Sequence, residues 1–310
     1  MLEKIDFESA PTALPYEALA ALADASVPNS TEGVCFVGPC SPDFSEKIIS
    51  GWMRFPETVR EFLVEEEFKL VAAQTAGRAL PNMAQKQIWK NDLYGRTHMD
   101  HAGGLYLNKN KKAVLAEFIW ARKEQPSVGA NVTEESILQR KWILQAKAEI
   151  VPTVYHEVWH AIDHLAAHVL GAGLVSSWGS FQAAYCNDLR ELGGREAAED
   201  RGYAYYVTEG NAGSFETFAE IGSEIMGKSL AGPRMIRDWP QSTNFIRSFY
   251  RELHQAGNRG GQGIYAYLKT SYEREEALYP SFSFSAAGQA LPSPYRPAPF
   301  SAGKSSFAPH

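Results

Sequence analysis

The feature that most constrains this chain is an HExxH motif at residues 156–160, which reads His-Glu-Val-Trp-His. Histidines four residues apart project from one face of an α-helix, one turn above the other. One zinc ion can therefore bind both His156 and His160, at about 2.0–2.1 Å each. Glu157 then lies beside the ion, close enough to take a proton from a metal-bound water. The motif predicts one zinc ion per chain and a general base next to it.

The residues around the motif favour a helix. Pro152 precedes Thr153, and proline suits a first helical position because its missing N–H has no helical partner there. Apolar residues recur at helical spacing beside the histidines, and Gly171 follows the last of them. We expect a helix over residues 153–170. The alternative is a buried structural helix whose two histidines are only hydrogen-bonded, since short motifs also arise by chance.

A third ligand has to come from another segment. His164 continues the spacing but lies eight residues after His156, about 12 Å along the helix axis, which one zinc ion cannot span. We therefore expect His164 and His168 on the outer face of the helix or behind the ligands.

Glu216 is the better candidate for the third ligand. Residues 215–226 have helical periodicity, and Ser214 is a suitable N-cap. Glu216 and Glu220 would share one face, so that Glu216 binds zinc while Glu220 accepts a hydrogen bond from a ligating imidazole. The alternative is a solvated acidic face of the helix.

The two segments together resemble a known family. HExxHAxD over residues 156–163, followed by ExFAE over residues 216–220, resembles the anthrax lethal factor-like zinc metallopeptidases of the gluzincin type, which include bacterial proline-specific endopeptidases. The resemblance implies a zinc site of two histidines and one glutamate, made here by His156, His160 and Glu216.

The same resemblance implies roles for further residues. Glu157 would be the general base, and Asp163 would support the ligands without binding zinc. The family also places a tyrosine shortly before the ligand glutamate, where its hydroxyl helps to stabilise an oxyanion. That implies Tyr205 or, as second choice, Tyr206. We expect a strand here, and adjacent strand residues face opposite sides, so only one of the two can face the site.

The order of the remaining elements favours an α+β fold. A helix over residues 55–67, a buried strand over 68–73, a hairpin over 104–119 and a helix over 134–150 precede the zinc helix. This order suits a zincin-like domain in which a small mixed sheet packs on helices, one carrying HExxH and a second carrying the ligand glutamate. A sheet edge above the metal can pair with an extended peptide.

Three regions differ in composition. We expect residues 1–44 to form a partly disordered leader segment, and residues 45–278 to form the zincin-like catalytic domain. Residues 279–310 are rich in serine, proline and alanine, and such segments favour extended or disordered states.

Charge and hydrophobicity exclude some classes of protein. A net charge of −6 and the lack of a basic, aromatic-interleaved patch argue against a nucleic-acid partner. No stretch is long enough to span a bilayer, and the first residues carry no secretory signal. We therefore expect a chain that is cytoplasmic as made, with export by a signal-independent route or delivery to a host cell remaining open. The sequence sets no oligomeric state.

These observations predict a zinc metallopeptidase, an endopeptidase that acts on peptide or protein substrates. The family resemblance allows either an effector or toxin that cuts a specific protein, or a bacterial endopeptidase with a narrow sequence preference. The alternative is a catalytically silent protein that uses the zincin fold to bind zinc or a partner.

Overall fold

The computed structural model describes residues 6–7, 31–81, 102–122, 142–147, 149–208, 210 and 212–280. In this part of the chain the strands are β1 (Asp6–Phe7), β2 (Val34–Val37), β3 (Lys69–Ala73), β4 (Gly104–Leu107), β5 (Lys112–Ala116), β6 (Phe118–Arg122) and β7 (Trp142–Ala146). The α-helices are α2 (Pro42–Met53), α3 (Glu57–Glu65), α4 (Ala76–Ala79), α6 (Ile150–Leu170), α7 (Gly179–Glu191), α8 (Arg195–Ala198), α9 (Ala212–Ile225), α10 (Arg234–Asp238), α11 (Pro240–Gly257) and α12 (Gly261–Leu278). Short helical turns are η2 (Asn108–Asn110), η3 (Val175–Ser177), η4 (Glu199–Tyr203) and η5 (Ala204–Val207).

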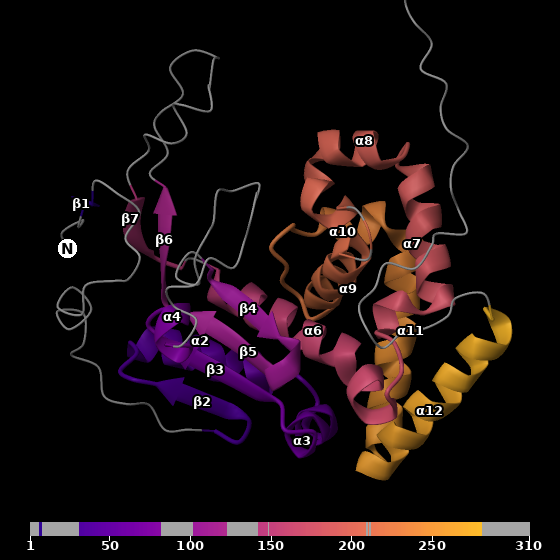
Figure 1. The fold of residues 1–310 in the computed structure, drawn as a ribbon, viewed down its shortest axis with the longest axis horizontal. Helices are drawn as coiled ribbons and strands as arrows, with labels where there is room; N and C mark the ends of the chain where they lie inside the picture. Colours follow the sequence, from indigo (N-terminus) through magenta and orange to yellow (C-terminus); the bar gives the residue numbers. More distant parts are fainter. Residues whose placement is uncertain are drawn as a thin grey trace, which may run out of the picture.

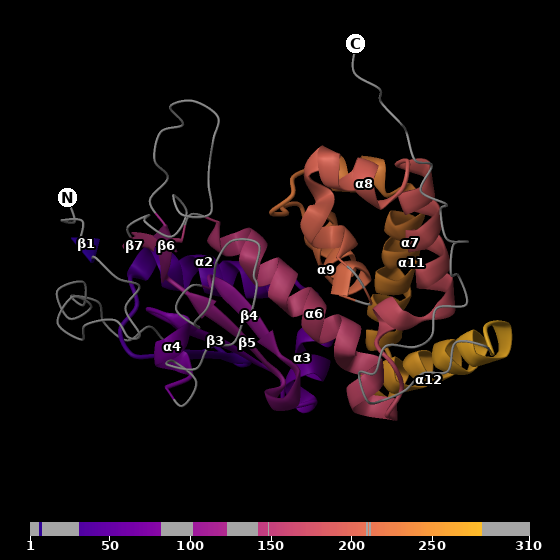
Figure 2. The ribbon, with the colours of Figure 1, turned by 45° about the horizontal axis from the view of Figure 1, so that its top comes forward.

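The long helix α6 lies between two halves of the molecule (Figures 1 and 2). On one side are the four-stranded sheet and the helices α2 and α3. On the other side are the helices that follow α6 in the chain, of which α9 packs closely against α6. Because both sides of α6 are covered, all of its residues from Thr153 to Ala166 are buried.

The larger sheet has the strand order β2-β3-β5-β4. The strands β2, β3 and β5 are parallel, whereas β4 pairs antiparallel with β5 and forms one edge. Side chains alternate between the two faces, as the strand period requires. Leu70 and Leu115 face the main core with α2 and α6, while Val71 and Val114 belong to a smaller apolar cluster on the opposite face. A second sheet has the order β1-β7-β6 and is antiparallel.

The two helices α6 and α9 pack closely, and one residue pair explains how. Gly222 of α9 lies directly under the indole ring of Trp159 of α6, where an added Cβ would overlap the ring atoms. Trp159 is fully buried, and its ring also contacts Phe218 at 5.6 Å and Tyr250 at 4.9 Å between centroids. A glycine at this position therefore lets the two helix backbones come near enough for their polar side chains to meet.

Carboxylates from distant elements bind the N-terminal N–H groups of two helices. Asp188 of α7 accepts hydrogen bonds from the N–H groups of Gln241 and Ser242 at the start of α11, at 3.0 and 2.7 Å. Glu275 of α12 accepts one from the N–H of Ser180 at the start of α7, at 3.0 Å. These bonds satisfy N–H groups that have no partner within their own helix, and they join helices that are far apart in sequence.

Most of the elements expected from the sequence are present. The mixed sheet, the hairpin of β4 and β5, and the helices α3, α6 and α9 are confirmed. The helices α6 and α9 each begin three residues earlier than expected. Ser214 therefore lies inside α9 rather than at its N-cap, and its hydroxyl oxygen accepts a hydrogen bond from Gln182 at 2.9 Å.

Two expectations are wrong. The predicted helix over residues 134–150 contains the strand β7 at 142–146. The predicted strand around Tyr205 is helical in the structure. The predicted leader, residues 1–44, includes β2 and the start of α2, which belong to the larger sheet and its core. Nearly all of the predicted tail lies outside the described residues. Within the described ranges, no helix combines the length and the apolar character that crossing a membrane requires.

Candidate metal centre

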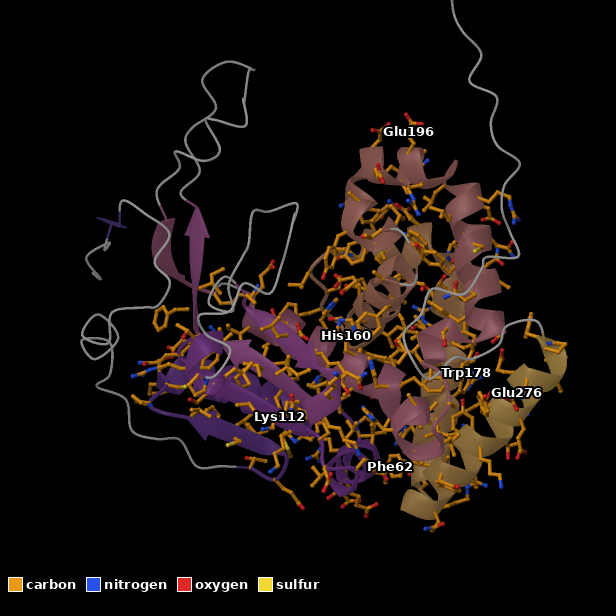
Figure 3. The ribbon with its side chains drawn as sticks, viewed as in Figure 1. Phe62, Lys112, His160, Trp178, Glu196 and Glu276 are labelled. Atoms are coloured by element: carbon orange, nitrogen blue, oxygen red, sulfur yellow. The ribbon has the colours of Figure 1, made fainter. Side chains whose placement is uncertain are left out.

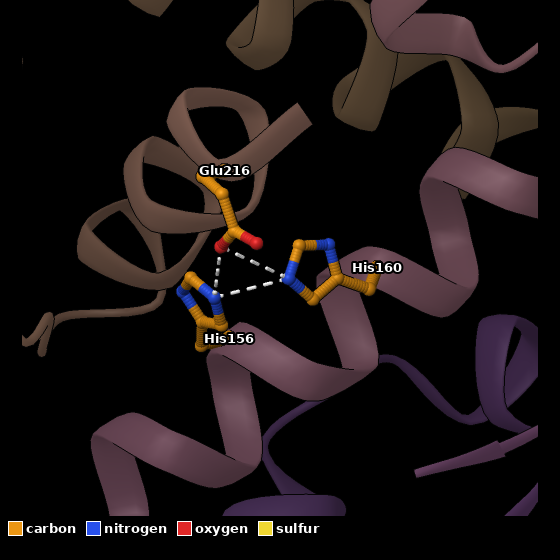
Figure 4. A group of neighbouring side chains, drawn as sticks. All are labelled: His156, His160 and Glu216. Atoms are coloured by element: carbon orange, nitrogen blue, oxygen red, sulfur yellow. Dashed lines mark hydrogen bonds and ion pairs between the residues drawn. The ribbon is translucent and has the colours of Figure 1, made fainter. Parts of the chain in front are cut away.

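Three side chains from two helices converge between the sheet and the C-terminal helices. His156 and His160 project from one face of α6, and their Nε2 atoms lie 3.0 Å apart. Glu216 reaches them from α9, with its Oε2 3.1 Å from Nε2 of His156 and 3.4 Å from Nε2 of His160 (Figure 4). Figure 3 shows His160 at the place where the two halves of the molecule meet. These residues form the one group of three potential metal ligands found in the described part of the chain.

The spacing of the three donor atoms fits zinc. Two ligands of a tetrahedral zinc ion, each at about 2.0–2.1 Å, lie about 3.3–3.4 Å from one another. The separations of 3.0, 3.1 and 3.4 Å agree with this to within a few tenths of an ångström. Two imidazoles and one carboxylate are also a common donor set of catalytic zinc sites, which keep a fourth position open. The residues present therefore fit the ion.

The electrostatics of the cluster favour a cation. Burial acts to lower the pKa of His156, but the carboxylates of Glu216 and Glu220 outweigh it and raise that pKa well above its usual value. Burial lowers the pKa of His160. The pKa of Glu216 is held well below its usual range, because the nearby imidazoles outweigh the effect of burial. The cluster thus attracts one positive charge, and a divalent ion can supply it by displacing the proton of His156.

Glu220 binds the imidazole of His156 on the side away from the other two ligands. Its Oε2 accepts a hydrogen bond from Nδ1 of His156 at 2.9 Å, and its Oε1 accepts one from the N–H of Ala231. Glu220 is completely buried. A carboxylate in this position fixes the tautomer of the imidazole and presents the other ring nitrogen to a metal. This is the contact that the sequence predicts for Glu220.

Glu157 lies beside the ligands, under the edge strand β4. A Cβ atom added to Gly104 would come within 2.5 Å of both Oε1 of Glu157 and Cγ2 of Thr153. Glycine at this position therefore allows the strand to pass directly over the carboxylate. Burial raises the pKa of Glu157 to about 7, although the charges of His156 and Lys147 act in the opposite direction. A carboxyl group with such a pKa can both accept and release a proton near neutral pH.

Asp163 is bonded to the turn that follows α6. Its Oδ1 accepts a hydrogen bond from the N–H of Ser176 at 2.5 Å, which ties α6 to the turn η3, and the supporting role implied for Asp163 stays a prediction. Its other oxygen, Oδ2, has no hydrogen-bond partner among the described residues, and neither has Nδ1 of His160. The carboxylate is therefore not bonded to a ligating imidazole, and what it supports directly is the turn after the zinc helix.

Tyr205 and Tyr206 lie in η5, next to α9. The carbonyl oxygen of Tyr206 accepts hydrogen bonds from the hydroxyls of Tyr185 at 2.9 Å and Thr217 at 3.0 Å. The two neighbouring rings pack edge to face, with centroids 5.4 Å apart. Since the segment is helical, the argument from alternating strand faces does not apply. The oxyanion role implied for one of these tyrosines stays a prediction.

The structure adds two aromatic residues that the sequence did not single out. Tyr106 of β4 lies over α6. Its ring contacts that of His164 at a tilt of 49°, with centroids 4.8 Å apart, and its hydroxyl is hydrogen-bonded to Nε2 of His168 at 3.1 Å. Phe215 of α9 stacks on His160, with centroids 4.0 Å apart. The alternation of Gly104 and Tyr106 in the predicted hairpin was the available signal, because both must face the same side of the strand.

His164 and His168, which follow the motif, contact these aromatic residues. His164 is buried, and its Nδ1 donates a hydrogen bond to the carbonyl oxygen of His160 at 2.9 Å. Burial lowers its pKa to about 4, so it is uncharged at neutral pH. Neither His164 nor His168 belongs to the three-ligand group, as the spacing predicts.

Comparison with known proteins shows a likeness to solved structures but not to known sequences. No protein-family model matches the chain, and no curated protein matches it. The fold is similar to that of the Pro-Pro endopeptidase PPEP-2 from Paenibacillus alvei, with 16% sequence identity and a TM-score of 0.44. The similarity covers 70% of this chain and 97% of the other. A similarity at this level carries no argument about activity, and membership of the lethal factor-like family stays a prediction.

Proposed function

We propose that this protein is a zinc-dependent endopeptidase that hydrolyses bonds within peptide or protein substrates. The observation that carries the proposal is the meeting of His156, His160 and Glu216 at zinc-ligand spacing beside the buried carboxyl group of Glu157. Two imidazoles and a carboxylate are ligands that zinc takes in hydrolytic sites, and a carboxyl group beside them can serve as the general base.

His156, His160 and Glu216 would hold the zinc ion, which when bound would polarise a water molecule and lower its pKa towards about 7. Glu157 accepts the proton that the water releases as its oxygen attacks the scissile carbonyl carbon. The same carboxyl group then returns the proton to the amine as the C–N bond breaks, which yields one new carboxylate and one new amino terminus. Glu220 keeps His156 in the tautomer that leaves Nε2 free to bind the ion.

The position of the edge strand β4 favours a peptide as the substrate. It is the last strand in the order of the larger sheet, and it lies over Glu157 at Gly104. An extended peptide can add to such an edge through backbone hydrogen bonds, which would bring its carbonyl groups past the general base. We therefore expect the substrate to bind in an extended form along β4.

The decisive experiment combines metal content and cleavage. Protein purified without a metal-affinity tag should contain about one zinc ion per chain. Incubation with a mixed peptide library, followed by mass spectrometry, should reveal new termini at a restricted set of sequences. Glu157→Gln should retain zinc and lose turnover by about 10²–10⁴-fold, the usual contribution of a general base.

Three outcomes would contradict the proposal in different ways. Undiminished cleavage by Glu157→Gln would remove Glu157 from the mechanism. Full zinc content with no cleavage of any peptide would leave a zinc-binding module without peptidase activity. A protein that takes up no zinc even after reconstitution would show that the motif is structural.

A further inference from the structure

The two imidazoles of the metal centre are supported in different ways. Nδ1 of His156 is hydrogen-bonded to the buried carboxylate of Glu220 at 2.9 Å. Nδ1 of His160 is buried and has no hydrogen-bond partner among the described residues. Most metal-binding histidines donate the second ring N–H to an acceptor, and that bond sets the orientation of the ring. The orientation of His160 therefore needs another cause.

An aromatic ring occupies the position from which His160 can be held. The ring of Phe215 lies 4.0 Å from the imidazole of His160, at an interplanar angle of 21°. Phe215 also meets His164 edge to face, with centroids 5.4 Å apart and an angle of 84°. A third ring, that of Tyr106, is nearly parallel to His160 at 29°, with a centroid distance of 6.2 Å. The tightest of these contacts is the one with Phe215.

We propose that Phe215 is a positioning residue for the metal centre, which orients His160 by stacking in the way that Glu220 orients His156 by a hydrogen bond. The inference rests on the proposed zinc site and adds a residue to it. Phe215 directly precedes Glu216, so α9 delivers one metal ligand and the ring that holds another from two adjacent positions.

Stacking restricts the imidazole differently from a hydrogen bond. A ring face at 4.0 Å limits the tilt of His160 but offers no acceptor to its Nδ1. The aromatic face is therefore the property that matters. A branched aliphatic side chain can fill a similar volume, but it presents no flat surface to the imidazole. An aliphatic substitution at Phe215 therefore tests whether the residue orients His160 or only fills space.

The test compares substitutions at Phe215 with a matched control in the same helix. Phe215→Leu removes the flat ring and keeps an apolar side chain, whereas Phe215→Tyr keeps the ring. Phe218→Leu is the control, because Phe218 is fully buried and contacts Trp159, Phe181 and Phe249 rather than a metal ligand. Zinc affinity is measured by competition with a chelator, and ligand geometry by the visible absorption spectrum of the cobalt-substituted protein.

Phe215→Leu should weaken zinc binding about tenfold or more, since groups that support metal ligands contribute roughly 10–100-fold to affinity. Its cobalt spectrum should change in band position or intensity, and Phe215→Tyr should restore both properties. Phe218→Leu should lower the melting temperature of the metal-free protein and leave the cobalt spectrum unchanged.

Wild-type affinity together with an unaltered cobalt spectrum in Phe215→Leu would overturn the positioning role while leaving the metal centre intact. The same loss of affinity in Phe218→Leu as in Phe215→Leu would also overturn it, because general loosening of α9 would then explain both. Failure of the wild-type protein to bind zinc or cobalt would instead overturn the metal centre and, with it, this inference.

Discussion

Two buried carboxyl groups on one helix have different surroundings in this protein. Glu157 and Asp163 both lie on α6, and burial raises the pKa of each to about 7. Glu157 lies under the edge strand beside the ligands, whereas Asp163 accepts the N–H of Ser176 in the turn after the helix. The same environment that makes one group useful for proton transfer makes the other a cost to stability when it ionises.

Asp163 should therefore make the protein less stable as the pH rises. Its pKa is raised from 3.8 to about 7 in the folded protein, so the folded state binds more protons than the unfolded state between these values. The contribution of Asp163 to stability is full below about pH 4 and is lost by about pH 7. Asp163→Asn keeps the acceptor for Ser176 and cannot ionise.

Chemical denaturation of both proteins from pH 4 to pH 8, with the zinc concentration held constant, measures this effect. Relative to wild type, Asp163→Asn should gain stability steadily across the range, by up to about 4 kcal/mol at pH 8. Parallel pH curves for the two proteins would show that Asp163 does not titrate in this interval.

At the scale of elements, the pair α6 and α9 decides whether the metal ligands meet. Both helices carry ligands, and the fit of Gly222 against Trp159 sets their approach. A change at this contact therefore acts on the site from a distance, without touching a ligand.

Gly222→Ala should separate the two helices. The added methyl group would overlap the indole of Trp159, and overpacking of this kind costs about 1–3 kcal/mol. We expect a lower melting temperature and weaker zinc binding, measured by calorimetry and chelator competition. Glu224→Ala, two residues along the same helix at a partly exposed position, is the control. Equal zinc affinity in Gly222→Ala and wild type would show that the helix spacing does not limit metal binding.

The strand β4 also approaches the site closely at a glycine, where Gly104 lies against Glu157. Gly104→Ala would place a methyl group against the carboxylate of Glu157, since a Cβ at this position would lie 2.5 Å from Oε1. We expect at least tenfold slower cleavage with unchanged zinc affinity, because the displaced group is the base and not a ligand. Leu105→Ala is the matched control, as Leu105 packs in the cluster on the opposite face of the sheet. Cleavage that falls equally in both variants would contradict a specific role for Gly104.

The elements that the sequence predicts are those with a local signal. Periodic apolar residues identify α6 and α9, and a run of apolar residues identifies β3. The start of α7 has no side-chain cap of its own, because the carboxylate that binds Ser180 comes from Glu275, 95 residues later. A partner so far along the chain leaves no trace in the local sequence, and α7 was not expected.

The residues of the candidate site also divide into those with a local sequence signal and those that only distant contacts bring together. His156, Glu157 and His160 are set by spacing within one helix, and the sequence predicts their shared position. Phe215 and Tyr106 act on the imidazoles from other elements, so only the tertiary structure reveals them. The role of Asp163 in supporting the ligands was inferred from a motif. In the structure its carboxylate accepts a hydrogen bond from the turn η3.

At the scale of the whole molecule, zinc would join two segments that are far apart in the chain. His156 and Glu216 are 60 residues apart in sequence, and the segment between them folds into α7, α8 and the turns around them. A ligand that binds only the folded state stabilises it in proportion to the logarithm of its concentration.

Removal of zinc should therefore lower the stability of the protein. At a free zinc concentration 100 times the dissociation constant, the stabilisation is about 2.7 kcal/mol, and it grows by about 1.4 kcal/mol for each further tenfold. Thermal unfolding in a series of zinc-buffered solutions measures this dependence. His160→Ala should show little of it, and a wild-type melting temperature that is independent of zinc would exclude binding to the folded state alone.

The separation of the ligands also sets an order of events during synthesis. When His156 and His160 leave the ribosome, Glu216 has not yet been made, because it follows His156 by 60 residues. The three-ligand site cannot close until α9 has emerged and packed on α6. Any proteolytic activity of this centre therefore begins only after α9 has been made, and a nascent chain that ends before α9 is kept from cutting itself or its neighbours.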